Sequence, residues 1–230
     1  MSIRTRYRQI RDEIPGHVTL VVAGKTRAPQ EIRDLIAAGA TNVGENYVQE
    51  ALAMRAALGE EAGKVTWHMI GYLQHNKINK ALRIFDVIQT VDSLDTARAL
   101  DKRVDRAGKT IVPCYIEINI GNEDTKAGIR PEEHEPFEEH MVRMVKDMSA
   151  LGHLRIEGLM TMGPRFGNPE DSRPYFKRIK GLFDTLRGLD APRVHMKHLS
   201  MGMTNSYRVA IEEGSNMVRI GTGVFGKRER

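Results

Sequence analysis

The segment LVVAGKTRAPQ, residues 20–30, joins an apolar run to a helical pattern and places Lys25 at the junction. The letters GKT resemble the end of a nucleotide-binding P-loop, which needs a glycine, four residues and then Gly-Lys-Ser/Thr. Gly24 would be the second glycine of that motif, so the first would fall at Thr19, inside the apolar run. Because no glycine-rich loop can wrap a phosphate chain here, we reject the P-loop interpretation.

Lys25 keeps two other interpretations. One is an ordinary solvated lysine in a loop. The other follows from its place directly after an almost wholly apolar run. A partly desolvated amine near a second cation, such as Arg219, has a lowered pKa and acts as a nucleophile. Such an amine forms a Schiff base with an aldehyde or a ketone.

Two glycine-rich segments near the end of the sequence have the composition of a phosphate site. They are SMGMT, residues 200–204, and IGTG, residues 220–223. Glycine lets backbone N–H groups approach phosphate oxygens, and Ser or Thr adds a hydroxyl. Together with the lysine, these segments predict a phosphorylated aldehyde or ketone as ligand. Pyridoxal 5′-phosphate (PLP) is the first candidate, and a sugar phosphate, as in an aldolase, is the second.

Arg219 and Asn46 are further candidates. A charge inside a strand is costly unless it is paired, so Arg219 could form an ion pair with Glu117. Alternatively, its guanidinium could face the pyridine nitrogen of PLP. Since arginine stays protonated, it would donate to that nitrogen and leave the ring neutral, which makes the ring a weak electron sink. Asn46 could bond the ligand ring, or cap the helix that follows it.

An alternation of strands and helices positions these residues. Eight apolar runs are predicted strands, at residues 17–24, 41–45, 65–71, 86–92, 111–120, 154–163, 195–202 and 216–226. Each but the last is followed by a helical pattern, and an extra helix over residues 3–14 precedes the first. Alternating elements predict a parallel sheet, and eight units in 230 residues fit a (β/α)8 TIM barrel formed by residues 1–230 as a single domain. A doubly wound open sheet is the alternative fold, and the leading helix is expected to cover the place of the missing eighth helix.

In either fold, ligands bind at the carboxyl ends of the strands. Barrel proteins often bind phosphate with the loops after strands seven and eight. SMGMT and IGTG follow those two strands, and Lys25 ends the first. The candidate residues therefore converge on one end of the predicted barrel.

Composition excludes several other classes. The net charge is +5, but basic residues are interleaved with acidic ones except at short ends such as KRER, so we expect no nucleic-acid partner. No apolar run is long enough to cross a membrane, and the first residues are too polar for a signal peptide. The one cysteine, Cys114, is predicted to be a packed strand residue. With a polar start and a single cysteine, a cytoplasmic protein is expected. His195 and His198 lie three apart in a strand, on opposite faces, so we expect no metal site.

The sequence resembles the YggS/PROSC group of PLP-binding homeostasis proteins through nearly its whole length. The matching segments are VVAGKT, NVGENYVQEAL, WHMIGYLQHNK, QTVDS, INIGNEDTKAGI, GLMTMGP, HLSMGMTNSY and MVRIGTGVFGKR. Their joint occurrence in this order is highly specific. The resemblance implies a fold-type III PLP-binding barrel like the N-terminal domain of alanine racemase, with PLP as an internal aldimine on Lys25. The implied cofactor contacts are Asn46, Ser200, Arg219, Gly221, Thr222 and Gly223, with the phosphate on Ser200 and residues 221–223.

The resemblance also implies a role in PLP (vitamin B6) homeostasis without an established reaction. PLP-dependent apo-enzymes are the candidate recipients, and a monomer is favoured. The alternative is a PLP-dependent amino-acid racemase, which needs a base on each face of its substrate, one from an added domain that we expect this chain to lack. Three residues depart from the family's pattern: Gly24 replaces a common Ser, Tyr72 a His or Pro, and Ser206 a frequent Asp.

Overall fold

The computed structural model describes residues 1–133, 136–164 and 167–226. Within these residues, eight parallel strands close into a barrel, because β1 pairs with both β2 and β8. The strands are β1 Thr19–Ala23, β2 Asn42–Glu45, β3 Thr66–Met69, β4 Val87–Val91, β5 Val112–Ile118, β6 Leu154–Thr161, β7 Val194–Ser200 and β8 Met217–Ile220. The predicted TIM barrel is confirmed, and the open-sheet alternative is wrong.

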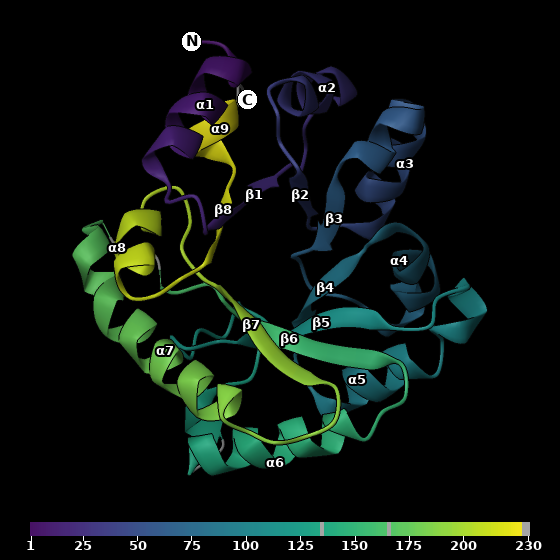
Figure 1. The fold of residues 1–230 in the computed structure, drawn as a ribbon, viewed down its shortest axis with the longest axis vertical. Helices are drawn as coiled ribbons and strands as arrows, with labels where there is room; N and C mark the ends of the chain where they lie inside the picture. Colours follow the sequence, from purple (N-terminus) through teal and green to yellow (C-terminus); the bar gives the residue numbers. More distant parts are fainter. Residues whose placement is uncertain (134–135, 165–166, 227–230) are drawn as a thin grey trace.

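Helices surround the barrel (Figure 1). They are α1 Ile3–Glu13, α2 Pro29–Ala37, α3 Val48–Leu58, α4 Ile78–Ile84, α5 Leu94–Asp101, α6 Phe137–Ser149, α7 Arg173–Arg187, α8 Tyr207–Glu212 and α9 Thr222–Phe225. Short 3-10 turns lie at η1 Gly59–Lys64, η2 His75–Lys77, η3 Asp105–Ala107, η4 Pro131–Glu133 and η5 Pro169–Ser172. The helices start where local chemistry favours it: Ser93 accepts the backbone N–H of Thr96 at 3.1 Å and caps α5.

The apolar core has two parts. The larger part fills the space between the strands and the helices. The smaller part plugs the barrel interior and consists of Val21, Val87, Tyr115, Met160 and Met217. Successive strand residues point to opposite faces, so each strand contributes to both parts. The small plug leaves room inside the barrel for buried polar side chains, among them His68, Gln89 and Arg219.

The predicted eighth strand was wrong at its end. Strand β8 stops at Ile220, and residues predicted to continue it form the one-turn helix α9 instead. Helix α1 lies beside α9 (Figure 1), where Arg6 donates to the carbonyls of Val224, at 2.6 Å, and Phe225, at 2.8 Å. Those carbonyls belong to the last turn of the helix and lack helical donors. Helix α1 therefore stabilises the short helix α9, which follows the eighth strand, instead of taking its place.

Several smaller expectations can be compared with the structure. Cys114 is buried, as predicted, and burial raises the pKa of its thiol to about 12. Within the residues described, no helix has both the length and the apolar character needed to span a bilayer. In the same part of the chain, His, Cys, Asp and Glu nowhere form a group of three or more that could hold a metal ion. The basic end KRER, residues 227–230, lies outside the described residues.

Two glycine substitutions test this packing in opposite directions. A Cβ at Gly158 in β6 would lie 2.0 Å from the carbonyl oxygen of His198 in β7, so Gly158→Ala must separate the two strands. We expect it to lower the free energy of unfolding by about 2 kcal/mol or more. Gly181 lies inside α7 with nothing within 4 Å of its Cβ position, so Gly181→Ala should raise that free energy by up to about 1 kcal/mol. Urea denaturation measures both, and equal effects of the two variants would contradict the packing described.

Candidate functional site

Lys25 lies at the mouth of the barrel, just after β1. Strand pairing continues one residue past β1, because the N–H of Gly24 donates to the carbonyl of Gly44 at 2.8 Å. A Cβ at Gly24 would point outward, 2.7 Å from Oε1 of Glu45 and 3.1 Å from Cδ1 of Ile32. Alternation along an extended chain then turns the next residue, the half-buried Lys25, toward the mouth. The same contact explains why a larger residue than glycine at position 24 would need Glu45 to move.

The turn after Lys25 is strained and held from outside. Thr26 has φ of 61°, a left-handed conformation that is unfavourable for a β-branched residue. Its N–H donates to Oε2 of Glu50, in α3, at 3.0 Å. Strain of this kind persists only where surrounding contacts impose it, and it gathers at functional sites. Glu50 therefore helps to set the position of Lys25.

A second carboxyl, that of Glu45, is buried behind the same turn. Burial, followed by the charge of Glu50, raises the pKa of Glu45 to about 8, while the backbone N–H of Asn46 acts in the opposite direction. Within the described residues, Oε2 of Glu45 has no hydrogen-bond partner. Glu45 is thus mainly protonated at neutral pH, which keeps two carboxylates from facing each other behind the lysine.

Asn46 follows β2, the strand next to β1, and is half-buried. The residue that caps α3 is Tyr47, and no side chain makes the capping bond. The interpretation of Asn46 as a helix cap is therefore wrong. No hydrogen bond of its side-chain amide is recorded among the described residues, so the amide can bond a ligand at the mouth.

Arg219 is the central charge of the site and is only 4% exposed. Its Nη1 donates to the carbonyl and to the hydroxyl of Ser200, at 2.8 and 2.7 Å, and its Nη2 donates to the carbonyl of Thr161 at 2.7 Å. No described acceptor takes the Nε–H. These three bonds fix the plane of the guanidinium and leave the Nε–H and one N–H of Nη2 for other acceptors.

The ion pair with Glu117 that the sequence suggested as one option is not formed. The bonds of Arg219 go to Ser200 and Thr161, although the positive charge is close enough to lower the pKa of Glu117 partly. Burial has the larger effect and raises the pKa of Glu117 to about 7. In the part of the chain that the structure describes, Oε2 of Glu117 has no hydrogen-bond partner. Burial lowers the pKa of Arg219 to about 10, so the guanidinium keeps its charge at neutral pH.

The loops after β7 and β8 meet at the same mouth. The N–H of Arg219 donates to the carbonyl of Gly202 at 3.0 Å. The hydroxyl of Thr204 accepts the N–H of Gly223 at 3.3 Å and lies 3.2 Å from the hydroxyl of Thr222. The predicted segments SMGMT and IGTG are therefore joined, and they offer hydroxyls and a glycine backbone at one place.

Ser200 is fully buried and already engaged. Its hydroxyl donates to Oε1 of Gln89 at 2.7 Å and accepts from Arg219. A hydroxyl has one proton, so Ser200 can donate to a phosphate only if it turns away from Gln89. Its assignment as a phosphate ligand stays a prediction.

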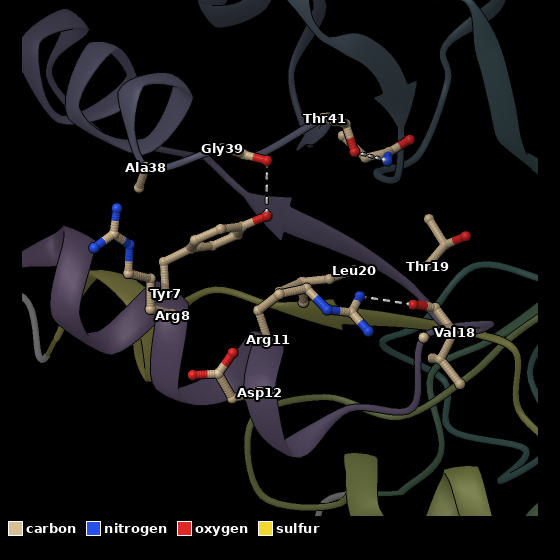
Figure 2. A pocket seen from close by; sticks show the side chains of 12 residues that line it. Tyr7, Arg8, Arg11, Asp12, Val18, Thr19, Leu20, Ala38, Gly39 and Thr41 are labelled. Atoms are coloured by element: carbon tan, nitrogen blue, oxygen red, sulfur yellow. Dashed lines mark hydrogen bonds between the residues drawn. The ribbon is translucent and has the colours of Figure 1, made fainter.

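A pocket of about 340 Å³ lies at the opposite, amino-terminal end of the barrel, between α1 and the starts of β1 and β2 (Figure 2). Its cation Arg11 donates to the carbonyls of Val18, Ile14 and Pro15, each at 2.8 Å, and Tyr7 donates to Gly39 at 3.2 Å. These bonds tie α1 to the barrel. Because the lysine and the glycine-rich loops lie at the other end, we assign the functional site there.

Comparisons with known proteins agree with the barrel fold and identify the family. The profile described as "Alanine racemase, N-terminal domain" matches residues 1–229. A pyridoxal phosphate homeostasis protein of Aquifex aeolicus (strain VF5) is 38% identical over 210 residues, which cover 91% of this chain and 87% of the relative. This chain belongs to the pyridoxal phosphate homeostasis protein family. A second member, from Haemophilus influenzae, is 36% identical over 211 residues, 92% of this chain and 85% of that protein.

Solved structures extend the family comparison. PipY of Synechococcus elongatus PCC7942, with PLP bound, matches with a TM-score of 0.86 and 31% identity, covering 98% of this chain and 100% of that one. An alanine racemase of Clostridium difficile 630 matches with a TM-score of 0.76 and 17% identity, covering 100% of this chain and 60% of the racemase. The racemase shows the shared barrel fold alone. The family resemblance found in the sequence is confirmed.

The sequence interpretation missed residues that support the site. Thr204 was visible as the last letter of SMGMT, but only structure shows that it bridges the two loops. Glu45 and Glu50 lie in the segment GENYVQE and become significant only because they pack behind Lys25. Gln89 is a polar residue inside an apolar predicted strand, and such a residue indicates a side chain that faces the barrel interior.

The buried carboxyl of Glu45 predicts a pH dependence of stability. Its folded pKa of about 8 is raised from 4.5, so its contribution to stability is full below pH 4.5 and is lost as the pH rises through 8. The lowered pKa of His68 opposes this trend only below 6.5. Between pH 6.5 and 8, the free energy of unfolding should fall with rising pH, by at most about 1.4 kcal/mol per pH unit for this one group. Glu117, with a pKa raised to about 7, adds a slope of the same sign below pH 7, so Glu45→Gln should flatten the profile mainly between pH 7 and 8.

Chemical denaturation across this range, with Glu60→Gln as an exposed control, checks the pH prediction. The control should keep the wild-type slope. An unchanged slope in Glu45→Gln would show that Glu45 is not the group responsible.

Proposed function

We propose that this protein binds PLP through an imine on Lys25 and acts in PLP homeostasis, without a dedicated reaction of its own. The observation that carries the proposal is the fixed, buried guanidinium of Arg219 at the mouth, beside the joined loops after β7 and β8 and next to the strand that leads to Lys25. PipY, a family member from Synechococcus elongatus, has been solved with PLP bound, which supports the ligand.

The residues present fit the chemistry of PLP. When bound, PLP supplies an aldehyde, which forms an imine with a lysine amine as one water leaves. Lys25 would supply the amine from a turn that Glu50 holds in place. Arg219 would offer its remaining Nε–H to the ring nitrogen, and the amide of Asn46 would contact the ring. Since Arg219 stays charged and does not give up its proton, the ring nitrogen would stay neutral and stabilise a carbanion poorly. That arrangement favours holding the cofactor over using it.

The phosphate would lie against the joined loops. We propose that Gly221 and Gly223 contribute backbone N–H groups and that Thr222 contributes a hydroxyl. Ser200, whose single proton goes to Gln89, would support the site by holding Arg219. A Cβ at Gly223 would lie 2.9 Å from Cγ2 of Ile220 and 3.2 Å from Cγ2 of Thr204, so the loop has no room for a side chain there. The uncompensated charge of Arg219 favours an anion at this end of the barrel.

The remaining parts of the proposal concern partners. We propose that apo-enzymes dependent on PLP receive the cofactor, that the protein works as a monomer and that it does so in the cytoplasm. Mixing PLP-loaded protein with an apo-enzyme across a dialysis membrane, and then without the membrane, separates transfer by contact from transfer through solution.

Lys25→Ala tests the imine. The wild-type protein should develop a visible absorption band with PLP, and borohydride should then add the mass of reduced PLP to the Lys25 peptide. Lys25→Ala should lose both signals because no amine remains at the mouth to form the imine. Lys64→Ala, at an exposed lysine before β3 on the opposite end of the barrel, is the matched control and should keep both. A visible band of wild-type strength in Lys25→Ala would sink the proposal.

Thr222→Val tests the phosphate site with little risk to the fold, because Thr222 is exposed and valine has nearly the same shape. Loss of one hydroxyl to a charged phosphate should weaken PLP binding by about 1–3 kcal/mol. Pyridoxal, which lacks the phosphate, should bind the variant and the wild type equally. Comparable losses for both ligands would place the phosphate elsewhere.

A further inference from the structure

A line of buried polar side chains crosses the barrel interior from β8 to β2. It runs from Arg219 to Ser200 at 2.7 Å, to Gln89 at 2.7 Å, to Nδ1 of His68 at 2.9 Å, and from Nε2 of His68 to Asn42 at 2.9 Å. Ser200 and Gln89 are 0% exposed, and His68 is 2% exposed. Such groups are costly to bury unless each finds its partner. In this hydrogen-bond network, the polar groups serve as one another's partners.

The donor and acceptor of every hydrogen bond in this network follow from its two outer members, Arg219 and Asn42. A guanidinium can only donate, so the oxygen of Ser200 accepts and its single proton goes to the amide oxygen of Gln89. The amide nitrogen of Gln89 then donates to Nδ1 of His68, which leaves the proton of His68 on Nε2 for Asn42. At the far end, the amide nitrogen of Asn42 donates to the hydroxyl of Thr41 at 2.9 Å, which is consistent with an amide oxygen facing His68.

A neutral imidazole is required for this pattern, since a charged one has no acceptor. Burial lowers the pKa of His68 to about 3, with His198 as a smaller cause, so the ring stays neutral at physiological pH. Gln89 is also close to Sδ of Met217, at 3.3 Å, which limits its movement. Gln89 therefore presents its amide oxygen, and not its nitrogen, to Ser200.

This orientation has a consequence for the candidate site. If the amide oxygen of Gln89 were absent, the buried hydroxyl of Ser200 would lose its acceptor and would rotate toward another one, which would carry its oxygen away from Nη1 of Arg219. Arg219 would then keep only two backbone acceptors, the carbonyls of Ser200 and Thr161. A charged group held by fewer bonds has more freedom to rotate, and its remaining Nε–H loses its fixed direction.

We propose that Gln89, oriented by His68, is a positioning residue that keeps the hydroxyl of Ser200 as an acceptor and thereby fixes the guanidinium of Arg219 for the cofactor. This inference rests on the proposed PLP site for its functional meaning. Among the described residues, Gln89 hydrogen-bonds to His68, Met217 and Ser200, and of these Ser200 is the one that contacts Arg219. Its effect must pass through Ser200.

A double-mutant cycle tests this route. The dissociation constant of PLP is measured by equilibrium dialysis for the wild type, Gln89→Met, Ser200→Ala and the double variant. Gln89→Met should weaken PLP binding about tenfold, which corresponds to the loss of the hydrogen bond between the charged Arg219 and the hydroxyl of Ser200. In the Ser200→Ala background the same change should have almost no effect, because the intermediary is missing. Independent losses that multiply in the double variant, or unchanged affinity in Gln89→Met, would overturn the proposal.

A matched control separates positioning from general destabilisation. Ile88 precedes Gln89 in β4 but packs in the outer core, so Ile88→Val costs about 1 kcal/mol of stability without touching the chain. It should bind PLP as the wild type does. If Gln89→Met does not fold, Gln89→Asn replaces it, since its amide is one methylene too short to reach both neighbours. Gln89→Asn should show the same dependence on Ser200.

A measurement on the cofactor-free protein tests the network even if PLP does not bind. In ¹⁵N NMR spectra, a fixed guanidinium should give Arg219 separate Nη signals, which should average in Gln89→Met and persist in Ile88→Val. Failure of the wild type to bind PLP with these signals intact would remove the proposed function but keep the positioning. Averaged Arg219 signals in the wild type would remove the positioning itself.

Discussion

The candidate site depends on the burial of one positive charge inside the barrel. The guanidinium of Arg219 is 4% exposed and no carboxylate lies within ion-pair distance of it in the described residues. Two carbonyls and one hydroxyl, from β6 and β7, satisfy it instead. These dipoles stabilise the charge without cancelling it. The mouth of the barrel therefore keeps a positive field, which favours an anionic ligand.

The opposite side of the site is organised by carboxyls outside the barrel wall. Glu50 holds the strained Thr26, and the buried Glu45 stands behind Gly24, so both flanks of Lys25 are fixed. The inner and outer arrangements differ in kind. Inside, neutral groups hold a charged arginine, whereas outside a protonated carboxyl avoids repelling a charged one. Both leave Lys25 and Arg219 with defined positions relative to β1 and β8, which pair directly.

How far the sequence predicted this site differed from residue to residue. The eight strands were recognised because apolar, β-branched runs recur between amphipathic helices, a local pattern that burial imposes on any parallel barrel. The end of the eighth strand was mistaken because the apolar composition of IGTGVFG suits a strand or a helix. The bonds from Arg6 of α1 that satisfy the last carbonyls of the helix come from the other end of the sequence. The sequence left two alternatives for the partner of Arg219, the carboxylate of Glu117 or a ligand. The choice was not readable in sequence, since it depends on which acceptors reach the guanidinium across three strands.

The sequence by itself determined the eight alternating strands and helices, the lysine after the first strand and the two glycine-rich segments after the last two, because strand periodicity and glycine chemistry are local properties. Closure into a barrel was the favoured expectation, and the pairing of β1 with β8 decided it. Tertiary structure alone decided which groups meet. It joined the two loops through Thr204, set Glu45 and Glu50 behind Lys25, and linked Arg219 to His68 through Ser200 and Gln89. Those contacts connect residues far apart in the chain, and they exist only because closing the barrel brings every strand to a common interior.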